Sequence, residues 1–288
     1  EITVAVVDTG VSPHPELRGR ILNGRSFVGY TSRTWDDNGH GTHVAGTIAG
    51  RNVGIAPRAN ILPIKVLDGE GSGSLGNLIA GLNWVNEYNS NNRNKVSVVN
   101  MSLSVDKSLT EGEKEGLHQA IKALVDNNVA VIVSAGNTGQ EEIRFPAAYD
   151  EVICVGAVDI NQKRAMFSTM GEHIDVCQVG VEVISAWYQG GYAKMSGTSM
   201  STPIVSGIAA LLAGKYKATF NEYITEDYLW KSLKFNTKDL GIKGADREYG
   251  TGFCTLQPLE LKVLLQNNSP YFKINGQVYR AEQNVNID

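Results

Sequence analysis

The sequence predicts an α/β protein with a doubly wound, mostly parallel central sheet and helices on both faces. Five short runs rich in valine and isoleucine lack the alternation of a half-exposed sheet, and such runs are typical of strands buried on both faces. These runs are residues 2–7, 61–66, 96–101, 129–134 and 152–158. Helical apolar spacing is found in residues 75–88, 110–127 and 199–216. Strands that alternate with helices define the α/β class.

Composition and charge exclude several function classes. The 288 residues carry 26 basic and 30 acidic side chains, a net charge of −4, and no stripe of basic residues. Nucleic-acid binding requires clustered Lys and Arg, so nucleic acid is not expected as a partner. The longest nearly apolar stretch, residues 204–213, is too short to span a bilayer, and a membrane partner is not expected either.

The composition changes near residue 265. We expect a main domain over residues 1–265 and a C-terminal extension over residues 266–288. Within the extension, Asn275-Gly276 lies between alternating apolar residues and predicts a β-hairpin with a type I′ turn over residues 271–279. Our hypothesis is that this hairpin adds an edge strand to the domain or masks its cleft.

The chain contains three cysteines in apolar surroundings and no CxxC pair. We expect Cys154, Cys177 and Cys254 to be buried thiols, and the alternative is one disulfide with one free thiol. Free thiols and the lack of a visible apolar leader at the start of the sequence favour the cytoplasm. A leader that was removed before Glu1 would instead mean secretion. The compartment and the oligomeric state are therefore left open.

Two polar motifs near the N-terminus contain groups suited to proton transfer. Asp8 ends the first predicted strand, where it either orients a histidine or caps a turn. His40 opens the motif HGTHVAG at the start of a predicted helix, and imidazole is the side chain best suited to act as a base near neutral pH. We expect His43 to be structural. Because no acidic third ligand accompanies the two histidines, no metal site is expected there.

Two further motifs contain a hydroxyl and an amide. Ser199 lies in GTSMSTP at the start of an apolar helix, where free N–H groups and the helix dipole favour an alkoxide, although the residue alternatively caps the helix. Asn137 follows a predicted strand in SAGN, where its amide either stabilises developing negative charge or forms a turn.

Taken together, these motifs resemble the subtilisin-like serine proteases, the subtilases. The shared features are the order Asp, His, Asn, Ser and the motifs DTG, HGTHVAG, NMSL, SAGN and GTSMSTP, and the resemblance runs from residue 2 to about residue 265. It implies a serine endopeptidase that forms an acyl-enzyme on Ser199. In that role His40 is the base, Asp8 orients His40, and Asn137 with the Ser199 N–H forms the oxyanion hole.

The resemblance also implies a cleft that binds a protein or peptide substrate in extended form, and that a pro-segment or inhibitor would also fit. Many relatives have glycine where this chain has Ser104, so we expect an altered primary pocket and a broad or apolar preference. The pair Asp36-Asp37 either favours basic substrate residues or forms a solvated loop. The implied substrate-binding residues are Gly71, Ser72, Gly73, Leu75, Ser102, Leu103, Ser104 and Gly136.

The chain departs from the family at a tight calcium site. Few residues precede Asp8, and the loop after the HGTHVAG helix is short, so we expect no strong calcium site, although Glu16 matches a ligand position. Backbone carbonyls near residues 147–152 leave room for a weak cation site, and no cofactor is required. Two alternatives to hydrolysis remain: a binding or scaffold protein on the same fold, and an acyl-transferring ligase or cyclase.

Overall fold

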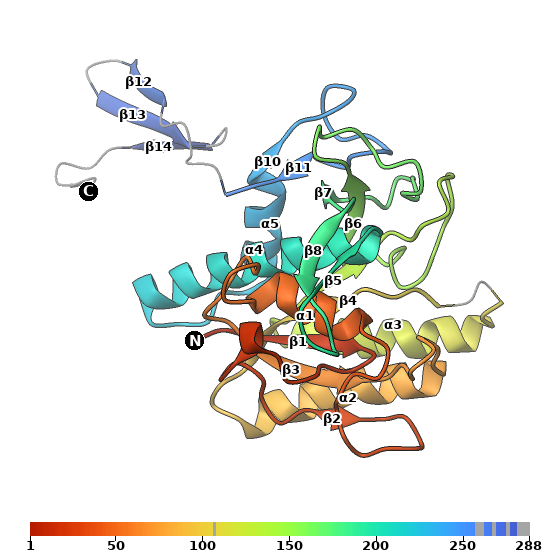
Figure 1. Cartoon of the computed structure of the whole chain (residues 1–288). Helices are drawn as coiled ribbons and strands as arrows, with labels where there is room; N and C mark the ends of the chain where they lie inside the picture. Colours follow the sequence, from red (N-terminus) through yellow and green to blue (C-terminus); the bar gives the residue numbers. More distant parts are fainter. Residues whose placement is uncertain (106–107, 257–261, 267–268, 275–276, 281–288) are drawn as a thin grey trace. The chain divides into compact units, whose positions relative to one another are not determined.

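A nine-stranded sheet forms the centre of the larger of two compact units, which spans Glu1–Cys254 (Figure 1). The computed structural model describes residues 1–105, 108–256, 262–266, 269–274 and 277–280. The strand order is β10-β11-β7-β6-β5-β4-β1-β3-β2, and every neighbouring pair is parallel except β10 with β11. The strands are β1 (Thr3–Asp8), β2 (Arg25–Ser26), β3 (Asn60–Lys65), β4 (Val96–Met101), β5 (Ala130–Ser134), β6 (Ile153–Val158), β7 (Val176–Val179), β10 (Thr237–Lys238) and β11 (Phe253–Cys254).

Helices cover both faces of this sheet (Figure 1). On one face lie α1 (His40–Ala49), α4 (Thr198–Phe220) and α5 (Glu226–Phe235), and on the other lie α2 (Leu75–Asn91) and α3 (Glu111–Asp126). Successive side chains of β1 enter the two cores in turn, because side chains alternate across a strand. The predicted doubly wound α/β fold, with a mostly parallel sheet, is confirmed.

The direction of strand progression reverses beside β1. That strand pairs with β3 on one side and with β4 on the other, and both pairings are parallel. Asp8 ends β1 and Met101 ends β4, so the residues that follow both strands emerge at the same edge of the sheet. In open α/β sheets, ligands bind outside the carboxyl ends of the strands at such a reversal. The fold therefore assigns this edge as the place for a site.

A small hairpin lies beside α1. It consists of β8 (Val183–Ala186) and β9 (Tyr192–Met195), which pair antiparallel. His43 is fully buried, and its Nε2 lies 3.1 Å from the carbonyl oxygens of both Val183 and Ala193, so an Nε2–H donates to this hairpin. His43 is thus a structural histidine that fastens the hairpin to α1.

The second unit spans Thr255–Asp288, so the boundary lies earlier than the one predicted at residue 265. Its strands β12 (Lys262–Gln266), β13 (Ser269–Ile274) and β14 (Gln277–Arg280) form an antiparallel sheet in which Ile274 pairs with Gln277. The predicted turn residues Asn275-Gly276 lie outside the described residues. The role predicted for this hairpin stays a prediction.

All three cysteines are buried free thiols in the larger unit. Cys154, Cys177 and Cys254 lie in β6, β7 and β11, respectively. In the part of the chain that the structure describes, no helix has both the length and the apolar character that crossing a membrane requires.

Candidate active site

Asp8 and His40 meet at the edge of the sheet where strand progression reverses. Asp8 ends β1, is fully buried, and its Oδ1 accepts hydrogen bonds from His40 Nδ1 at 2.8 Å and from the Thr9 N–H at 2.7 Å. This close approach requires a glycine after His40, because a Cβ at Gly41 would lie 2.1 Å from the Gly10 carbonyl oxygen. Since Nδ1 of His40 donates to Asp8, Nε2 of the neutral ring is left as the acceptor.

Two opposing effects act on the pKa of His40. Burial lowers this pKa, but the negative charge and hydrogen bond of Asp8, together with the charge of Asp36, outweigh burial, and the pKa lies above the usual 6.5. The imidazole keeps a side-chain exposure of 20%, so its outer edge is open to a substrate. His40 therefore combines access with a raised affinity for a proton.

Ser199 lies in the first turn of α4, and its backbone carbonyl has an unusual partner. Pro203 lies four residues later and lacks the N–H that would bond this carbonyl in a regular helix. The Ser199 carbonyl instead accepts the hydroxyl of Ser102 at 2.9 Å. In return, the Ser199 hydroxyl donates to the Ser102 carbonyl at 3.2 Å.

A buried polar chain holds Ser102 in place. Ser206 Oγ donates to Asn100 Oδ1 at 2.9 Å, and Asn100 Nδ2 donates to Ser102 Oγ at 3.0 Å. Asn100 and Ser206 are fully buried, and these bonds connect the end of β4 to α4. The chain fixes the position of Ser199 relative to the edge of the sheet.

Asn137 lies after β5, facing the N-terminus of α4. Its Oδ1 accepts the Thr198 N–H at 2.9 Å and the Thr198 hydroxyl at 3.0 Å. Since the amide oxygen faces these donors, Nδ2 is the group that faces away from Thr198 and is available to a ligand. The start of α4 adds further N–H groups and the positive end of a helix dipole. The arrangement is suited to an anionic oxygen.

The structure joins the four predicted catalytic residues in two groups. Asp8 is bonded to His40, while Asn137 and Ser199 share the N-terminus of α4, and α1 and α4 pack against each other. Within the described residues, no hydrogen bond joins Ser199 to His40, because the Ser199 hydroxyl is directed to the Ser102 carbonyl. Hydrogen bonds between catalytic groups, such as the one expected between Ser199 and His40, often shorten only when a substrate binds.

A cavity of about 340 Å³ gathers six of the eight predicted substrate-binding residues. Seven of its lining residues are leucine or valine, and the other five are glycine or serine. Ser102 and Gly136 are not in this lining; they lie next to Ser199 and Asn137, respectively. The residues that line the cavity are Val66, Leu67, Gly71, Ser72, Gly73, Ser74, Leu75, Leu78, Leu103, Ser104, Val105 and Leu109.

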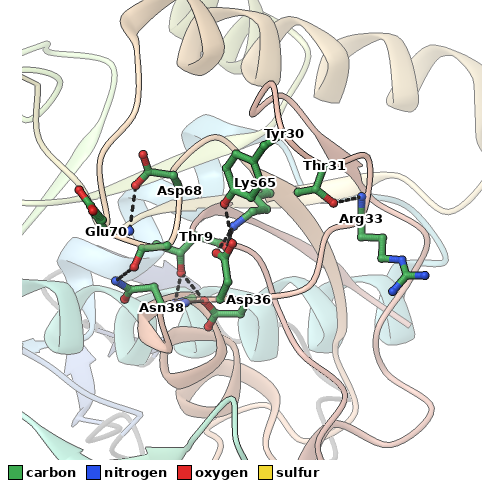
Figure 2. Close-up of polar contacts among 12 residues, drawn as sticks. Thr9, Tyr30, Thr31, Arg33, Asp36, Asn38, Lys65, Asp68 and Glu70 are labelled. Atoms are coloured by element: carbon green, nitrogen blue, oxygen red, sulfur yellow. Dashed lines mark hydrogen bonds and ion pairs between the residues drawn. The ribbon is translucent and has the colours of Figure 1, made fainter.

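The structure gives Asp36 and Asp37 different surroundings: Asp36 is buried (Figure 2), whereas the side chain of Asp37 is 42% exposed to solvent. Asp36 is buried, and its carboxylate accepts five hydrogen bonds from N–H and O–H groups of the protein. Asp37 is bound by the fully buried Lys65 at 2.6 Å and by the Tyr30 hydroxyl. Sequence reasoning missed Lys65, and its one signal was a lysine within an otherwise apolar strand.

The carboxylate of Glu16 is fully engaged by hydrogen-bond donors. Oε2 accepts the Asn52 N–H at 2.7 Å, and Oε1 accepts the Asn52 amide and the Tyr192 hydroxyl, each at 2.7 Å. Burial raises the pKa of Glu16, but these bonds and the backbone N–H of Val53 lower it to about 2. N–H and O–H donors point where a cation would have to bind, so these residues do not fit a calcium ion. In the described part of the chain, no cluster of three or more His, Cys, Asp or Glu residues suits a metal.

Comparison with known proteins shows which family the chain resembles. A model described as the subtilase family matches residues 1–252. The chain is 41% identical over 228 residues to the thermostable alkaline protease of Halalkalibacterium halodurans, across 77% of this chain and 60% of that protein. It is 42% identical over 261 residues to subtilisin Savinase of Lederbergia lenta, across 89% of each.

A solved structure also resembles the chain. The crystal structure of a cold-adapted subtilisin-like serine proteinase superimposes with a TM-score of 0.74 at 33% identity, across 88% of this chain and 86% of that one. The chain spans less than two thirds of the length of the H. halodurans relative. The family match nevertheless covers almost the whole of the larger unit. The chain belongs to the subtilase family.

Proposed function

We propose that the protein is a serine endopeptidase that cleaves protein or peptide substrates through an acyl-enzyme on Ser199. The observation that carries this proposal is the hydrogen bond between Asp8 and His40, at the sheet edge where Ser102 is bonded to Ser199. The proposal is also supported by the relatives, which are named as proteases and as a subtilisin.

In the first half of the reaction, the Ser199 hydroxyl turns from the Ser102 carbonyl and attacks the peptide carbonyl. His40 Nε2 takes the hydroxyl proton and then gives it to the leaving amine, so the C–N bond breaks while a C–O ester forms. Asp8 keeps the ring in the tautomer that donates from Nδ1, and its charge stabilises the imidazolium. Water then attacks the ester through the same base, which releases the acid and restores Ser199.

In this proposal, an oxyanion forms in each half of the reaction, and two hydrogen-bond donors bind it. Asn137 Nδ2 is one, because Thr198 holds the amide oxygen in the opposite direction. The backbone N–H of Ser199, at the start of α4, is the other. Both donors are fixed before the reaction, so little reorganisation is needed when negative charge develops.

The substrate class follows from the lining of the 340 Å³ cavity. An extended peptide lying between Gly71–Gly73 and residues 102–104 would place one side chain in this cavity. Because leucine and valine side chains line it, we propose that the enzyme prefers an aliphatic or aromatic residue there. Lys65 already neutralises Asp37, which weakens the alternative that this carboxylate selects basic residues.

One experiment separates the alternatives. The protein is incubated with a mixed peptide library, and the products are analysed by mass spectrometry beside the variant Ser199→Ala. Hydrolysed peptides that depend on Ser199 support the endopeptidase, whereas ligated or cyclised peptides identify an acyl transferase. Unchanged peptides from a folded protein, with no labelling of Ser199 by a fluorophosphonate, would favour a scaffold.

We propose further that the larger unit needs no cofactor and no calcium at Glu16. This proposal is supported by the hydrogen bonds that the Glu16 carboxylate accepts from Asn52 and Tyr192. These bonds link the segment after α1 to β9, as a bound cation would. The weak cation site predicted near residues 147–152 stays a prediction.

A further inference from the structure

Asp36 is a buried carboxylate with an unusual set of partners (Figure 2). Its Oδ1 accepts the Thr9 hydroxyl at 2.8 Å and the backbone N–H groups of Asn38 and Gly39 at 3.0 and 2.9 Å. Its Oδ2 accepts the Thr42 N–H at 2.8 Å and the Thr42 hydroxyl at 2.7 Å. All five contacts come from donors, so the acceptor-only, ionised form of the carboxylate fits them.

These partners lie on both sides of the Asp8–His40 pair. Thr9 directly follows Asp8, while Gly39 and Thr42 flank His40 in the first turn of α1. The N-cap residue Gly39 offers no side-chain cap, so Asp36 satisfies N–H groups that the helix leaves unpaired. One carboxylate therefore ties the end of β1 to the start of α1.

The Thr9 hydroxyl also helps to link the end of β1 to the start of α1. It donates to Asp36 and also accepts the Gly41 N–H at 2.9 Å. A second bridge runs from the Ser12 N–H to the Thr42 hydroxyl at 3.0 Å. The segment that carries His40 is thus held against the segment that carries Asp8 through groups that the catalytic proposal does not use.

The charge of Asp36 has no cationic partner within the described residues. The adjacent Asp37 takes the ammonium group of Lys65 instead. The titratable groups around His40 are Asp8 at the end of β1, Asp36 before α1 and His43 one turn later in α1, with the Asp37–Lys65 pair behind Thr9. Asp36 is thus a second negative charge that acts on the imidazole.

We infer that Asp36 is a positioning residue for the catalytic base: it fixes His40 against Asp8 and adds a second negative charge that stabilises the imidazolium formed during the reaction. This inference rests on the proposed function, because it assigns a role within the same proton transfer. Asp36 does not reach a substrate; it acts through His40.

The test compares Asp36→Asn with wild type and with the control Asp159→Asn. Asp159 also accepts two backbone N–H groups, from Asn161 and Lys163, but it follows β6, three strands away from β1. The measurements are kcat and KM for peptide cleavage and the His40 pKa, followed by NMR of labelled histidines and assigned with His40→Gln.

We expect Asp36→Asn to lower kcat by about 10- to 100-fold, the scale of a small misplacement of a catalytic group, with KM changed less than about twofold. We also expect the His40 pKa to fall, because one negative charge is lost. Asp159→Asn should leave both quantities at wild-type values. A lower melting temperature in Asp36→Asn with unchanged kcat and unchanged His40 pKa would overturn the inference and leave Asp36 as a helix cap only.

Two further variants keep the inference testable if Asp36→Asn does not fold. Thr42→Val and Thr9→Val each remove one hydroxyl donor and keep the charge, so a lower kcat in either supports the positioning role, and wild-type kcat in both overturns it. If the wild-type protein cleaves no peptide, the proposed function fails, but the NMR titration still shows whether Asp36 acts on His40.

Discussion

At the scale of single residues, the proposed mechanism makes peptide cleavage depend on the protonation state of His40. Only neutral His40 can take the Ser199 proton, and its pKa is raised above 6.5 because Asp8 and Asp36 outweigh burial. We expect kcat/KM to rise with pH through a pKa above 6.5. A profile that stays flat between pH 5 and 9 would contradict this role for His40.

The variant Asp8→Asn tests the same assignment. Removing the charge lowers the pKa of His40, so the acidic limb of the profile moves to lower pH. The expected loss in kcat is roughly 10⁴-fold, because the amide favours the wrong tautomer, as in other Asp-His-Ser triads. Pre-steady-state assays across pH measure both effects. A loss of activity without a shift of the limb would show that Asp8 does not set the pKa.

Substitution can separate the two functions proposed for Asn137, which are oxyanion binding and capping of α4. Asn137→Asp keeps the oxygen that holds the Thr198 N–H but replaces the Nδ2 donor by a carboxylate oxygen. If Nδ2 binds the oxyanion, kcat falls by about 10²–10³-fold or more with little change in KM, the loss known for such a donor in subtilisin. Steady-state kinetics measure this change. A near-normal kcat in Asn137→Asp would show that Asn137 only caps α4.

The site residues that the sequence predicts are those whose chemistry is visible in a short motif. Asp8, His40, Asn137 and Ser199 each lie at the end of a predicted strand or at the start of a predicted helix. The role of Asp36 was not predictable, because it depends on hydrogen bonds to Thr9 and other groups that only the folded chain brings together.

At the scale of secondary structure, Pro203 inside α4 is expected to affect both stability and the position of Ser199. Pro203→Ala restores an N–H that competes with Ser102 for the Ser199 carbonyl. We expect the free energy of unfolding to rise, by up to about 3 kcal/mol, the usual cost of proline inside a helix, while kcat falls several-fold. Chemical denaturation and peptide cleavage measure the two changes. A variant that is both more stable and fully active would show that Ser102 does not position Ser199.

The Glu16 cluster gives a second prediction at this scale. The folded-state pKa of about 2 lies below the usual 4.5, so the ionised form is favoured by folding. Its stabilisation, roughly 2 to 3 kcal/mol after solvent screening, is present above pH 4.5 and is lost as the pH falls toward 2. We expect Glu16→Gln to lower the melting temperature at pH 7 by roughly 5 to 10 °C.

Chelation provides the matched control for that variant. Since the carboxylate of Glu16 is occupied by Asn52 and Tyr192, EDTA should leave the melting temperature at pH 7 unchanged. Calorimetry with EDTA and with added calcium measures this. A large drop in EDTA that calcium reverses in the wild type but not in Glu16→Gln would contradict the proposal that the larger unit needs no calcium at Glu16.

The length and burial of an element decide whether it was predictable. The five buried strands were predicted within about one residue, because a short, continuous apolar run between turn residues is typical of a strand buried on both faces. The elements β7, β8, β9 and α5 were missed. The first three have four residues each, β9 is largely exposed, and α5 has only ten residues with two buried positions. Periodicity is too weak a signal over such short segments.

At the scale of the whole molecule, the thiols report on the integrity of the fold. Burial raises the pKa of all three, that of Cys254 to about 12, so none is a reactive thiolate at neutral pH. We expect an aromatic disulfide reagent at pH 8 to modify none of the thiols in the native protein and three in denaturant. If the thiols react over long incubations in native conditions, the rate of this slow modification should equal the rate of global unfolding. One rapidly reacting thiol in the native protein would contradict the buried positions.

The spread of the site along the chain has a consequence for synthesis. Asp8 and His40 precede Ser199 in the chain, and Ser199 is made only after β7 and the hairpin β8–β9. Under the proposed mechanism, a nascent chain therefore lacks its nucleophile until most strands of the sheet have been made. We expect such an order of translation to protect neighbouring polypeptides, because the proposed nucleophile is made after the other three proposed catalytic residues.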